Sequence, residues 1–250
     1  MAETASPITE DRILGGRVLL RQAAEGYRAG LDAALLAAAC DADEGARVLE
    51  AGCGVGAVLL AASARRPGAR FVGIERDAAA LALADHNIAA NGLGERIAAL
   101  RGDIGEPFSR LGLKPFDAVL ANPPFFDDPA ELRAPHPAKA GAWMADAGLE
   151  AWVGFLLKAV REGGAITLIH RADRLGDILA ALAPKAGSVQ VRAIYPFADQ
   201  PAKRVLVRAV KSGKAPLRLL PPLVLHERGG AKHTPEAEAI LRGEAALAWR

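Results

Sequence analysis

Cysteine is scarce in this chain of 250 residues, which contains only Cys40 and Cys53. Two cysteines cannot form a disulfide framework, and no C-x-x-C pair indicates a zinc site. Long hydrophobic runs are also missing, since stretches such as residues 33–40 (AALLAAAC) are far shorter than the roughly 18 apolar residues of a membrane span. No cationic start leads into an apolar segment, as it would in a secretory signal. We therefore expect a cytoplasmic protein that binds neither a membrane nor a metal.

The chain also lacks a strong net charge, since its formal net charge is only +2. This value does not by itself indicate binding to nucleic acid or membranes. Hydrophobic residues make up 51% of the chain, which is enough for a sizeable core and excludes global disorder.

The basic segment, residues 201–233, departs from this balance. From Lys203 to His233, eight lysines and arginines occur with a single acid, Glu227. The eight are Lys203, Arg204, Arg208, Lys211, Lys214, Arg218, Arg228 and Lys232. The segment consists either of solvated strand faces or of a surface that attracts phosphates. In the second case Lys203 and Arg204 are candidate contacts to RNA.

Strand-like and helix-like stretches alternate between residues 46 and 170. The expected strands are 46–52, 70–75, 96–102, 116–122 and 165–170, and the expected helices are 55–66, 77–91 and 149–161. Such alternation is typical of an α/β protein with a mainly parallel central sheet and helices on both faces. Two further strands, 189–197 and 203–211, are joined by a turn too short for a parallel crossover. We therefore expect an antiparallel C-terminal strand pair.

The domain organisation is simple, because the chain has no internal repeat and no low-complexity linker. We expect a flexible N-terminal tail over residues 1–10 and a single domain over residues 11–250. Gly163 and Gly164 are expected to end the helix at 149–161, and Thr234 with Pro235 to begin a short final helix.

A glycine loop follows the first strand of the alternating region, in the sequence Glu50-Ala-Gly-Cys-Gly-Val-Gly56. Glycines there allow a tight turn and the close approach of a ligand. The second strand ends in Glu75, whose carboxylate can accept hydrogen bonds from both hydroxyls of a ribose. Asp103 follows the third strand and can accept a hydrogen bond from an adenine amino group. Together these residues predict an adenosine pocket at the carboxyl edge of the sheet.

The fourth strand runs into the sequence Asn122-Pro-Pro-Phe125. An amino group conjugated to a ring is a poor nucleophile, because its lone pair is delocalised. Hydrogen bonds from its N–H groups to the side-chain oxygen of Asn122 and the carbonyl of Pro123 favour a more pyramidal nitrogen. Phe125 can stack on a planar target and orient it. We predict that Asn122, Pro123 and Phe125 are catalytic.

The Asn-Pro-Pro-Phe motif and the glycine loop resemble those of class I S-adenosylmethionine-dependent methyltransferases that act on planar amino groups. Within this class the chain is most similar to the bacterial valine-tRNA adenine-37 N6-methyltransferases, over nearly everything after residue 12. The blocks that carry the resemblance include ILGGRVLLRQ (13–22), GYRAGLDAALLAA (26–38), GGAITLIHRADRL (163–175), the long block at 201–227 and TPEAEAILR (234–242). The resemblance implies a Rossmann-like fold, S-adenosyl-L-methionine as cofactor and methylation of N6 of adenine 37 in valine tRNA.

The resemblance also implies roles for individual residues. The methionine end of the cofactor would lie against Glu50, Gly52 and Gly54, the ribose on Glu75 and the adenine on Asp103. The target base would lie against Asn122 and Phe125. The pocket would be closed from the other side by Tyr27, Arg28 and Asp32. The chain departs from the family in two places: the first strand more often ends in Asp-Leu-Gly, and tyrosine is commoner at the position of Phe125.

Other substrates and roles stay open at this point. The same motif serves guanine-N2 methylation of rRNA, and protein glutamine methylation needs no basic surface. A fourth alternative is an RNA-binding protein without catalytic activity. Residues 127–148 could form a loop over the substrate. The sequence leaves the oligomeric state undetermined.

Overall fold

The computed structural model describes residues 7–25, 28–124 and 148–249. The strands are β1 (Ile8–Ile13), β2 (Val18–Ala23), β3 (Arg47–Ala51), β4 (Arg70–Glu75), β5 (Ile97–Arg101), β6 (Phe116–Ala121), β7 (Val160–Arg171), β8 (Ala186–Tyr195), β9 (Arg204–Lys211), β10 (Arg218–Leu219) and β11 (Leu223–Val224). The helices are α1 (Leu31–Ala38), α2 (Ala57–Arg65), α3 (Ala78–Ala90), α5 (Leu149–Ala159), α6 (Leu175–Leu182) and α7 (Pro235–Arg242), with 3-10 turns η1 (Phe108–Leu111) and η3 (Ala172–Arg174).

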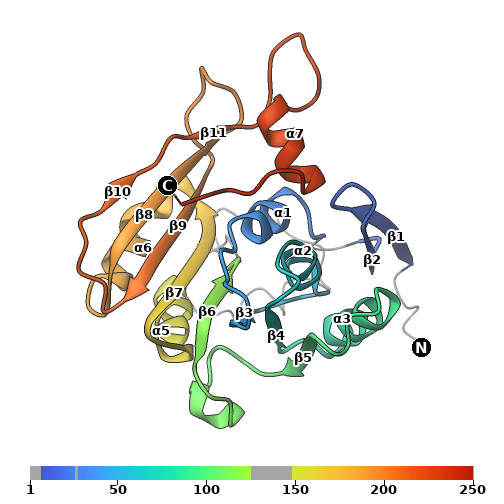
Figure 1. Cartoon of the computed structure of the whole chain (residues 1–250), viewed down its shortest axis with the longest axis vertical. Coiled ribbons are helices and arrows are strands. Elements are labelled where there is room, and N and C mark those ends of the chain that lie inside the picture. The colour runs from blue at the N-terminus through green and yellow to red at the C-terminus, as the bar shows by residue number, and fades with distance from the viewer. Residues whose placement is uncertain (1–6, 26–27, 125–147, 250) are drawn as a thin grey trace.

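Within the described residues, nine strands form one sheet in the order β10-β8-β9-β7-β6-β3-β4-β5, and β11 also pairs with β8. The five neighbours β7, β6, β3, β4 and β5 are all parallel. Strand β9 is antiparallel to both β7 and β8, so β8 runs in the same direction as β6 and β7. Figure 1 shows β10 at one end of this sheet and β5 toward the other. The mainly parallel α/β sheet and the antiparallel C-terminal pair are both confirmed.

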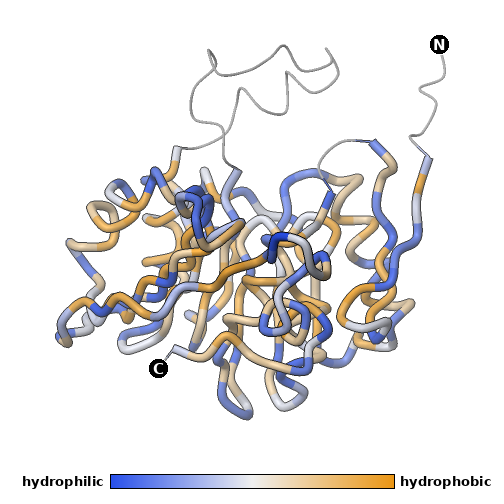
Figure 2. Tube along the Cα trace, turned by 90° about the horizontal axis from the view of Figure 1, so that it is seen from above, coloured by the Kyte–Doolittle hydropathy of each residue, from blue (hydrophilic) through white to orange (hydrophobic). Residues whose placement is uncertain are grey.

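Two hydrophobic cores cover the two faces of the sheet. One contains buried leucines and isoleucines of α1, α2, α3 and α7, and the other contains apolar residues of α5, α6 and η1. Neighbouring strand residues alternate between them, because successive side chains of a strand point to opposite faces. Val48 lies in the first core and Leu49 in the second. Figure 2 shows hydrophobic stretches gathered in the central strands.

An N-terminal hairpin of β1 and β2 lies beside α3 rather than in the main sheet. Asn87 and Asn91 hold it through their side-chain amides. Asn91 accepts from the Leu19 N–H at 2.9 Å and donates to the Leu19 carbonyl at 2.8 Å. Asn87 makes the same pair of bonds with Arg21, at 2.8 and 2.9 Å. The two amides therefore substitute for a neighbouring strand along β2.

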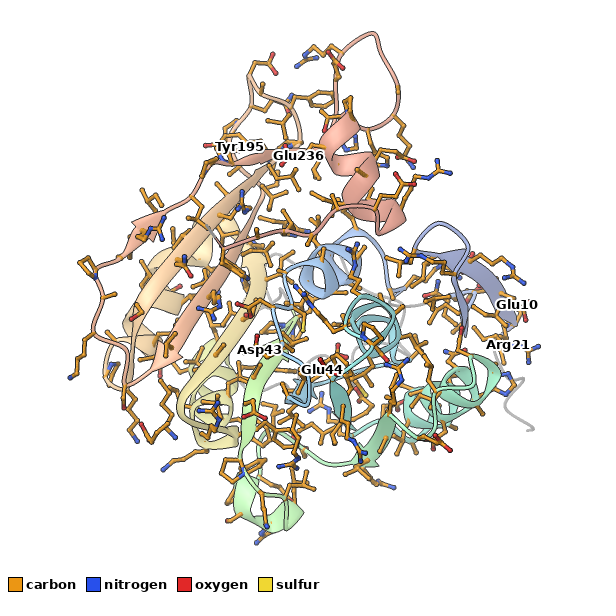
Figure 3. All side chains as sticks on the ribbon, viewed as in Figure 1. Glu10, Arg21, Asp43, Glu44, Tyr195 and Glu236 are labelled. Atoms are coloured by element: carbon orange, nitrogen blue, oxygen red, sulfur yellow. The ribbon has the colours of Figure 1, made fainter. Side chains whose placement is uncertain are left out.

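The outer strand of the hairpin, β1, is charged. Its Glu10 and Arg21 of β2 form an ion pair at 2.9 Å, and both side chains are labelled in Figure 3. Because β1 begins at Ile8, the expected flexible tail was wrong for residues 8–10. Residues 1–6 lie outside the described part of the chain, and the single domain stays a prediction.

A C-terminal strap, residues 244–249, runs from α7 back to the sheet. Leu247 is buried, and its N–H donates to the Ala38 carbonyl at 3.1 Å. The Trp249 indole donates to the Ala39 carbonyl at 2.7 Å. Three side chains donate to strap carbonyls: Arg65 to Ala245 at 2.8 Å, Arg192 to Ala248 at 2.6 Å and Gln190 to Trp249 at 2.7 Å. Thr234 caps the N-terminus of α7 as expected, accepting from the Ala237 N–H at 3.2 Å, and Pro235 stands in the first turn.

One expected boundary was wrong. Gly163 and Gly164 do not end the preceding helix, because α5 stops at Ala159 and β7 begins at once at Val160. A Cβ on Gly164 would lie 2.8 Å from the Asp117 carbonyl oxygen. Gly164 therefore serves a close approach between the backbones of β7 and β6.

Candidate functional site

The carboxyl ends of β3, β4, β5 and β6 meet at one edge of the sheet, because these four strands are parallel. Glu75 ends β4, and Asp103 comes two residues after β5. In the register between β3 and β6, Ala51 stands opposite Ala121. The next residues, Gly52 and Asn122, therefore leave adjacent strands at the same level, and adjacent strands lie about 4.8 Å apart. The structure thus brings the predicted site residues of four strands to a common edge.

The glycine loop uses two of its glycines for different reasons. Gly52 and Gly54 both have positive φ, at 66° and 54°. A Cβ on Gly52 would lie 2.5 Å from the ring of Trp152, so this glycine makes room for a side chain of α5. A Cβ on Gly54 would meet no atom of the described residues within 4 Å. Gly54 therefore borders open space, as expected of a backbone that a ligand approaches closely.

The carboxylate of Glu75 is held by two backbone donors. One oxygen accepts from the Gly54 N–H at 2.9 Å, and the other accepts from the Asp77 N–H at 2.8 Å. A carboxylate oxygen has two lone pairs, so each can accept a further hydrogen bond. Glu75 is thus fixed against the glycine loop and retains acceptors for two hydroxyl groups.

Glu50 lies below this surface and is only 2% exposed. Burial raises the pKa of its carboxyl group well above the ordinary value, against the effect of a hydrogen bond from the Leu59 backbone and together with the nearby charge of Glu75. Leu59 belongs to the first turn of α2, whose free N–H groups favour a carboxylate. Glu50 therefore connects β3 to the start of α2 beneath the glycine loop.

Asp103 and the Asn-Pro-Pro sequence complete the edge. Asp103 accepts from the Gly105 N–H at 2.8 Å, which orients it in a tight turn after β5. Asn122 is half-buried with its side-chain oxygen covered, and Pro123 is buried. Phe125 lies outside the described residues, as do residues 127–147 of the expected loop at 127–148.

The residues expected to close the pocket contact other parts of the chain. Arg28 donates to Asp11 at 2.7 Å and to Thr9 at 2.7 Å, so it holds the N-terminal hairpin. Asp32 accepts from Arg204 at 3.0 Å. Tyr27 lies outside the described residues. Arg28 is thus paired with a carboxylate of the protein itself.

The basic segment is less charged in the fold than in the sequence. Half of its eight cations form ion pairs with acids from elsewhere in the chain. These pairs are Arg204 with Asp32, Arg208 with Asp41, Lys211 with Glu162 and Arg228 with Asp199. Lys203 and Lys214 are exposed and have no ion pair within the described residues. Of the two candidate RNA contacts, Lys203 is exposed and Arg204 is paired.

Two residues of this region were missed as parts of the site. Trp152 packs on Gly52, and its indole nitrogen is buried without a hydrogen-bond partner among the described residues. Asn87 donates to the Val55 carbonyl of the glycine loop at 2.9 Å, in addition to its bonds with the hairpin. No local pattern distinguishes Asn87, because its partners lie 32 and 66 positions away.

The described residues contain neither a cluster of metal ligands nor a helix that could span a membrane. No group of three or more histidine, cysteine, aspartate or glutamate residues there could hold a metal ion. No helix in that part of the chain has the length and apolar character needed to cross a membrane.

Comparisons with known proteins find methyltransferases among the relatives of this chain. Residues 28–136 match the methyltransferase small domain family. Over 187 residues the chain is 31% identical to the tRNA1(Val) (adenine(37)-N6)-methyltransferase of Porphyromonas gingivalis, and the match covers 72% of each protein. Over 95 residues it is 41% identical to the release factor glutamine methyltransferase of Gloeobacter violaceus, covering 38% of this chain and only 32% of that relative.

A solved structure extends the likeness to nearly the whole chain. The crystal structure of a predicted O-methyltransferase from Agrobacterium tumefaciens matches with a TM-score of 0.72 at 28% identity, covering 87% of this chain and 98% of that one. The fold, the glycine loop and the Asn-Pro-Pro sequence define a class I S-adenosylmethionine-dependent methyltransferase. The chain belongs to the methyltransferase small domain family, and its cofactor is S-adenosylmethionine. Both the family resemblance and the cofactor predicted from the sequence are confirmed.

Proposed function

We propose that this enzyme methylates N6 of adenine 37 in valine tRNA, in the cytoplasm. The main support for this proposal is the placement of Asn122 beside Gly52. The two residues follow directly after Ala121 and Ala51, which stand opposite each other on the adjacent strands β6 and β3. The tRNA specificity is supported by the relative from Porphyromonas gingivalis, which matches across 72% of the chain.

The residues at the sheet edge fit the cofactor. Open space beside Gly54 admits the methionine end, and the fixed carboxylate of Glu75 retains acceptors for two ribose hydroxyls. Asp103, one strand further, would accept from the adenine amino group. When bound, the cofactor supplies an electrophilic methyl group on its sulfonium. Glu50 would act from beneath, by holding the glycine loop and α2 in position.

Asn122 and Pro123 would then act on the target nitrogen. Their oxygens accept hydrogen bonds from the two N–H groups of the adenine amine, which favours a pyramidal nitrogen with an available lone pair. No strong base is needed, because the nitrogen becomes more acidic once it carries the methyl group and loses its proton afterwards. Phe125 would hold the flat base in line for transfer.

A base in the anticodon loop suits such a site. It is already single-stranded, so presenting it costs less free energy than extruding a base from a duplex. Lys203 is exposed at the start of β9 and would contact a phosphate. We expect less from Arg204, because Asp32 already neutralises it.

A protein substrate is the second candidate. The release factor glutamine methyltransferase of Gloeobacter violaceus is 41% identical over 95 residues, and a glutamine amide is also a planar amino group. The ion pairs within the basic segment weaken the argument for RNA that its sequence suggests. A guanine-N2 target in rRNA would use the same chemistry.

One assay separates these candidates. The purified protein is incubated with methyl-labelled cofactor and, in parallel, with total tRNA, rRNA or a release factor. Digestion and mass spectrometry then identify the methylated product. N6-methyladenosine in valine tRNA supports the proposal, whereas N2-methylguanosine or methylglutamine would replace it.

The first prediction concerns Asn122. Replacing it with alanine is expected to lower kcat by roughly 100-fold or more, because a hydrogen bond made in the transition state is lost. Cofactor affinity, measured by calorimetry, should stay within about twofold. Asn122→Asp is the matched control, since it keeps an acceptor oxygen at this position and should retain measurable transfer. Equal turnover of Asn122→Ala and the wild type would exclude the assigned role.

A further inference from the structure

Strands β8 and β11 bring two more loops to the edge that carries Asn122. Because β8 runs parallel to β6 and β7, the residues after Tyr195 lie at the same edge as those after Ala121. Strand β11 is parallel to β8, with Val224 opposite Tyr195. Helix α7 contacts β11, and Figure 3 labels Tyr195 of β8 and Glu236 of α7 at this end of the molecule. In the strand order, β8 is three steps from β6, or about 14 Å.

These two loops form an aromatic–cation cluster, which comprises Phe197, His226, Arg228 and His233. The rings of Phe197 and His226 lie 5.5 Å apart, and those of His226 and His233 are stacked at 5.1 Å. The Arg228 guanidinium lies over the Phe197 ring at 4.8 Å. The three rings are half-buried and Arg228 is exposed, so the cluster is part of the surface.

The same two loops also carry lysines. Lys203, at the start of β9, and Lys232, beside His233, are exposed and form no ion pair within the described residues. Nδ1 of His226 donates to the Lys232 carbonyl at 2.6 Å, which leaves Nε2 available to another partner. Arg228 forms an exposed ion pair with Asp199 at 3.1 Å. Exposed ion pairs are weak, so a phosphate can replace Asp199 as the partner of Arg228.

Rings that can stack on bases, flanked by unpaired cations, are the combination that binds single-stranded nucleic acid. A purely structural role, in which the rings pack the two loops together, would explain the contacts among the rings. It would not explain why exposed lysines stand in both loops. We propose that the aromatic–cation cluster binds a nucleotide of the RNA strand close to the target base, by stacking on Phe197 and His226. This inference rests on the proposed RNA substrate and assigns part of its binding surface.

The test measures the affinity of valine tRNA by fluorescence anisotropy at fixed salt. Phe197→Leu removes the ring face and is expected to weaken binding about tenfold, within the range for the loss of one stacked base. Phe197→Tyr keeps the ring face and should restore binding. Thermal melting and cofactor titration of each variant verify that the fold and the cofactor pocket are intact.

A second pair of variants tests the cations independently of the rings. Lys203→Ala removes a charge just before β9, on the proposed surface. Lys214→Ala is the control, because it removes a charge beyond the other end of β9. Only Lys203→Ala should weaken tRNA binding and reduce the slope of log Kd against log salt, by about one unit.

The outcomes separate this inference from the proposed function. If the wild type binds and methylates tRNA while Phe197→Leu and Lys203→Ala both bind it as the wild type does, the cluster has no such role and the function stands. If the wild type binds no RNA at all, both are overturned.

Discussion

Neighbouring residues at the sheet edge differ in what they contact. Gly52 faces the ring of Trp152 and Gly54 faces open space, although both have positive φ. A substitution at Gly52 therefore disturbs packing with α5, whereas one at Gly54 fills open space that we propose the cofactor occupies. Two glycines of one motif thus have different surroundings, a packed ring at Gly52 and open space at Gly54.

The buried Glu50 gives a prediction on pH. A carboxyl whose folded pKa is raised holds its proton more tightly in the folded state, so stability falls as pH rises above about 4.5, the ordinary value. Glu50→Gln mimics the neutral form and retains an acceptor for Leu59. We expect the variant to have a higher free energy of unfolding than the wild type at pH 8, by an amount that shrinks toward pH 4.5.

Urea unfolding between pH 4.5 and pH 8 measures this difference. Glu44→Gln, at an exposed position on the amino side of β3, is the control and should show no such trend. If the difference in free energy of unfolding between Glu50→Gln and the wild type were constant over this range, the pKa of Glu50 would not be raised in the folded state.

The positions of the candidate site residues were predictable from the sequence where a side chain follows its own strand. Glu75, Asp103 and Asn122 each come at or just after a recognisable strand, so parallel strands bring them together. Arg204 could not be assigned in this way, because its partner Asp32 lies 172 positions away. A count of charges within one segment misses acids that the fold supplies from elsewhere.

At the scale of elements, Asp117 joins three strands at the opposite edge of the sheet. This residue of β6 accepts from the Arg47 N–H of β3 at 2.8 Å and from the Arg161 side chain of β7 at 2.7 Å. These hydrogen bonds lower the pKa of Asp117 below its ordinary value of 3.8. A lowered folded pKa stabilises the protein above pH 3.8, and this contribution is lost as pH falls through the folded value.

We expect Asp117→Asn to lower the free energy of unfolding at pH 7 by about 1 kcal/mol, allowing for the partial exposure of the side chain. The loss should diminish below pH 4. The exposed pair of Arg174 and Asp177 provides the control, since Asp177→Asn should cost less than about 0.5 kcal/mol. Equal losses for the two variants in urea unfolding at pH 7 would refute the bridging role of Asp117.

The alternating elements between residues 46 and 170 were predictable because each has a local pattern and a glycine or capping residue at its end. The hairpin was not, since β1 (ITEDRI) has charges on successive residues and no clear apolar face. Its position depends on Asn87 and Asn91, which follow it by more than 60 residues. The end of α5 was predicted wrongly, because a pair of glycines such as Gly163 and Gly164 is typical of the end of a helix. Gly164 instead lies within β7, where it allows the backbone of β6 to approach closely.

At the scale of the whole molecule, the C-terminal strap connects α1, α2 and β8. Deleting residues 244–250 would remove one carbonyl acceptor each from Arg65, Gln190 and Arg192, while Arg65 keeps its contact with the Ile240 carbonyl and Arg192 keeps its contact with the Pro221 carbonyl. Burial already lowers the pKa of Arg65 to about 10, which reflects its poor solvation. A hydrogen bond from a charged group contributes about 1.5–3 kcal/mol and one from an amide about 0.5–1.5 kcal/mol, so we expect a total loss of at least roughly 3 kcal/mol.

Differential scanning calorimetry tests this prediction. For a chain of this size the loss corresponds to a fall in Tm of about 10 °C. Trp249→Phe removes the indole N–H that donates to Ala39 and part of the ring but keeps the strap, so its Tm should fall far less. A truncated protein that melts within about 2 °C of the full chain would mean that the strap is dispensable.

The outer side of β8 ends the sheet in a particular way. Instead of one long neighbour it has β10 and β11, two strands of two residues each, separated by Pro221 and Pro222 with Leu220. Prolines lack the N–H that would continue a ladder, and such short strands offer little backbone to an incoming chain. Although Leu219 is 75% exposed there, this margin is a poor template for fibril-like growth. The β8 margin therefore gives other copies of the chain little backbone on which to add a strand.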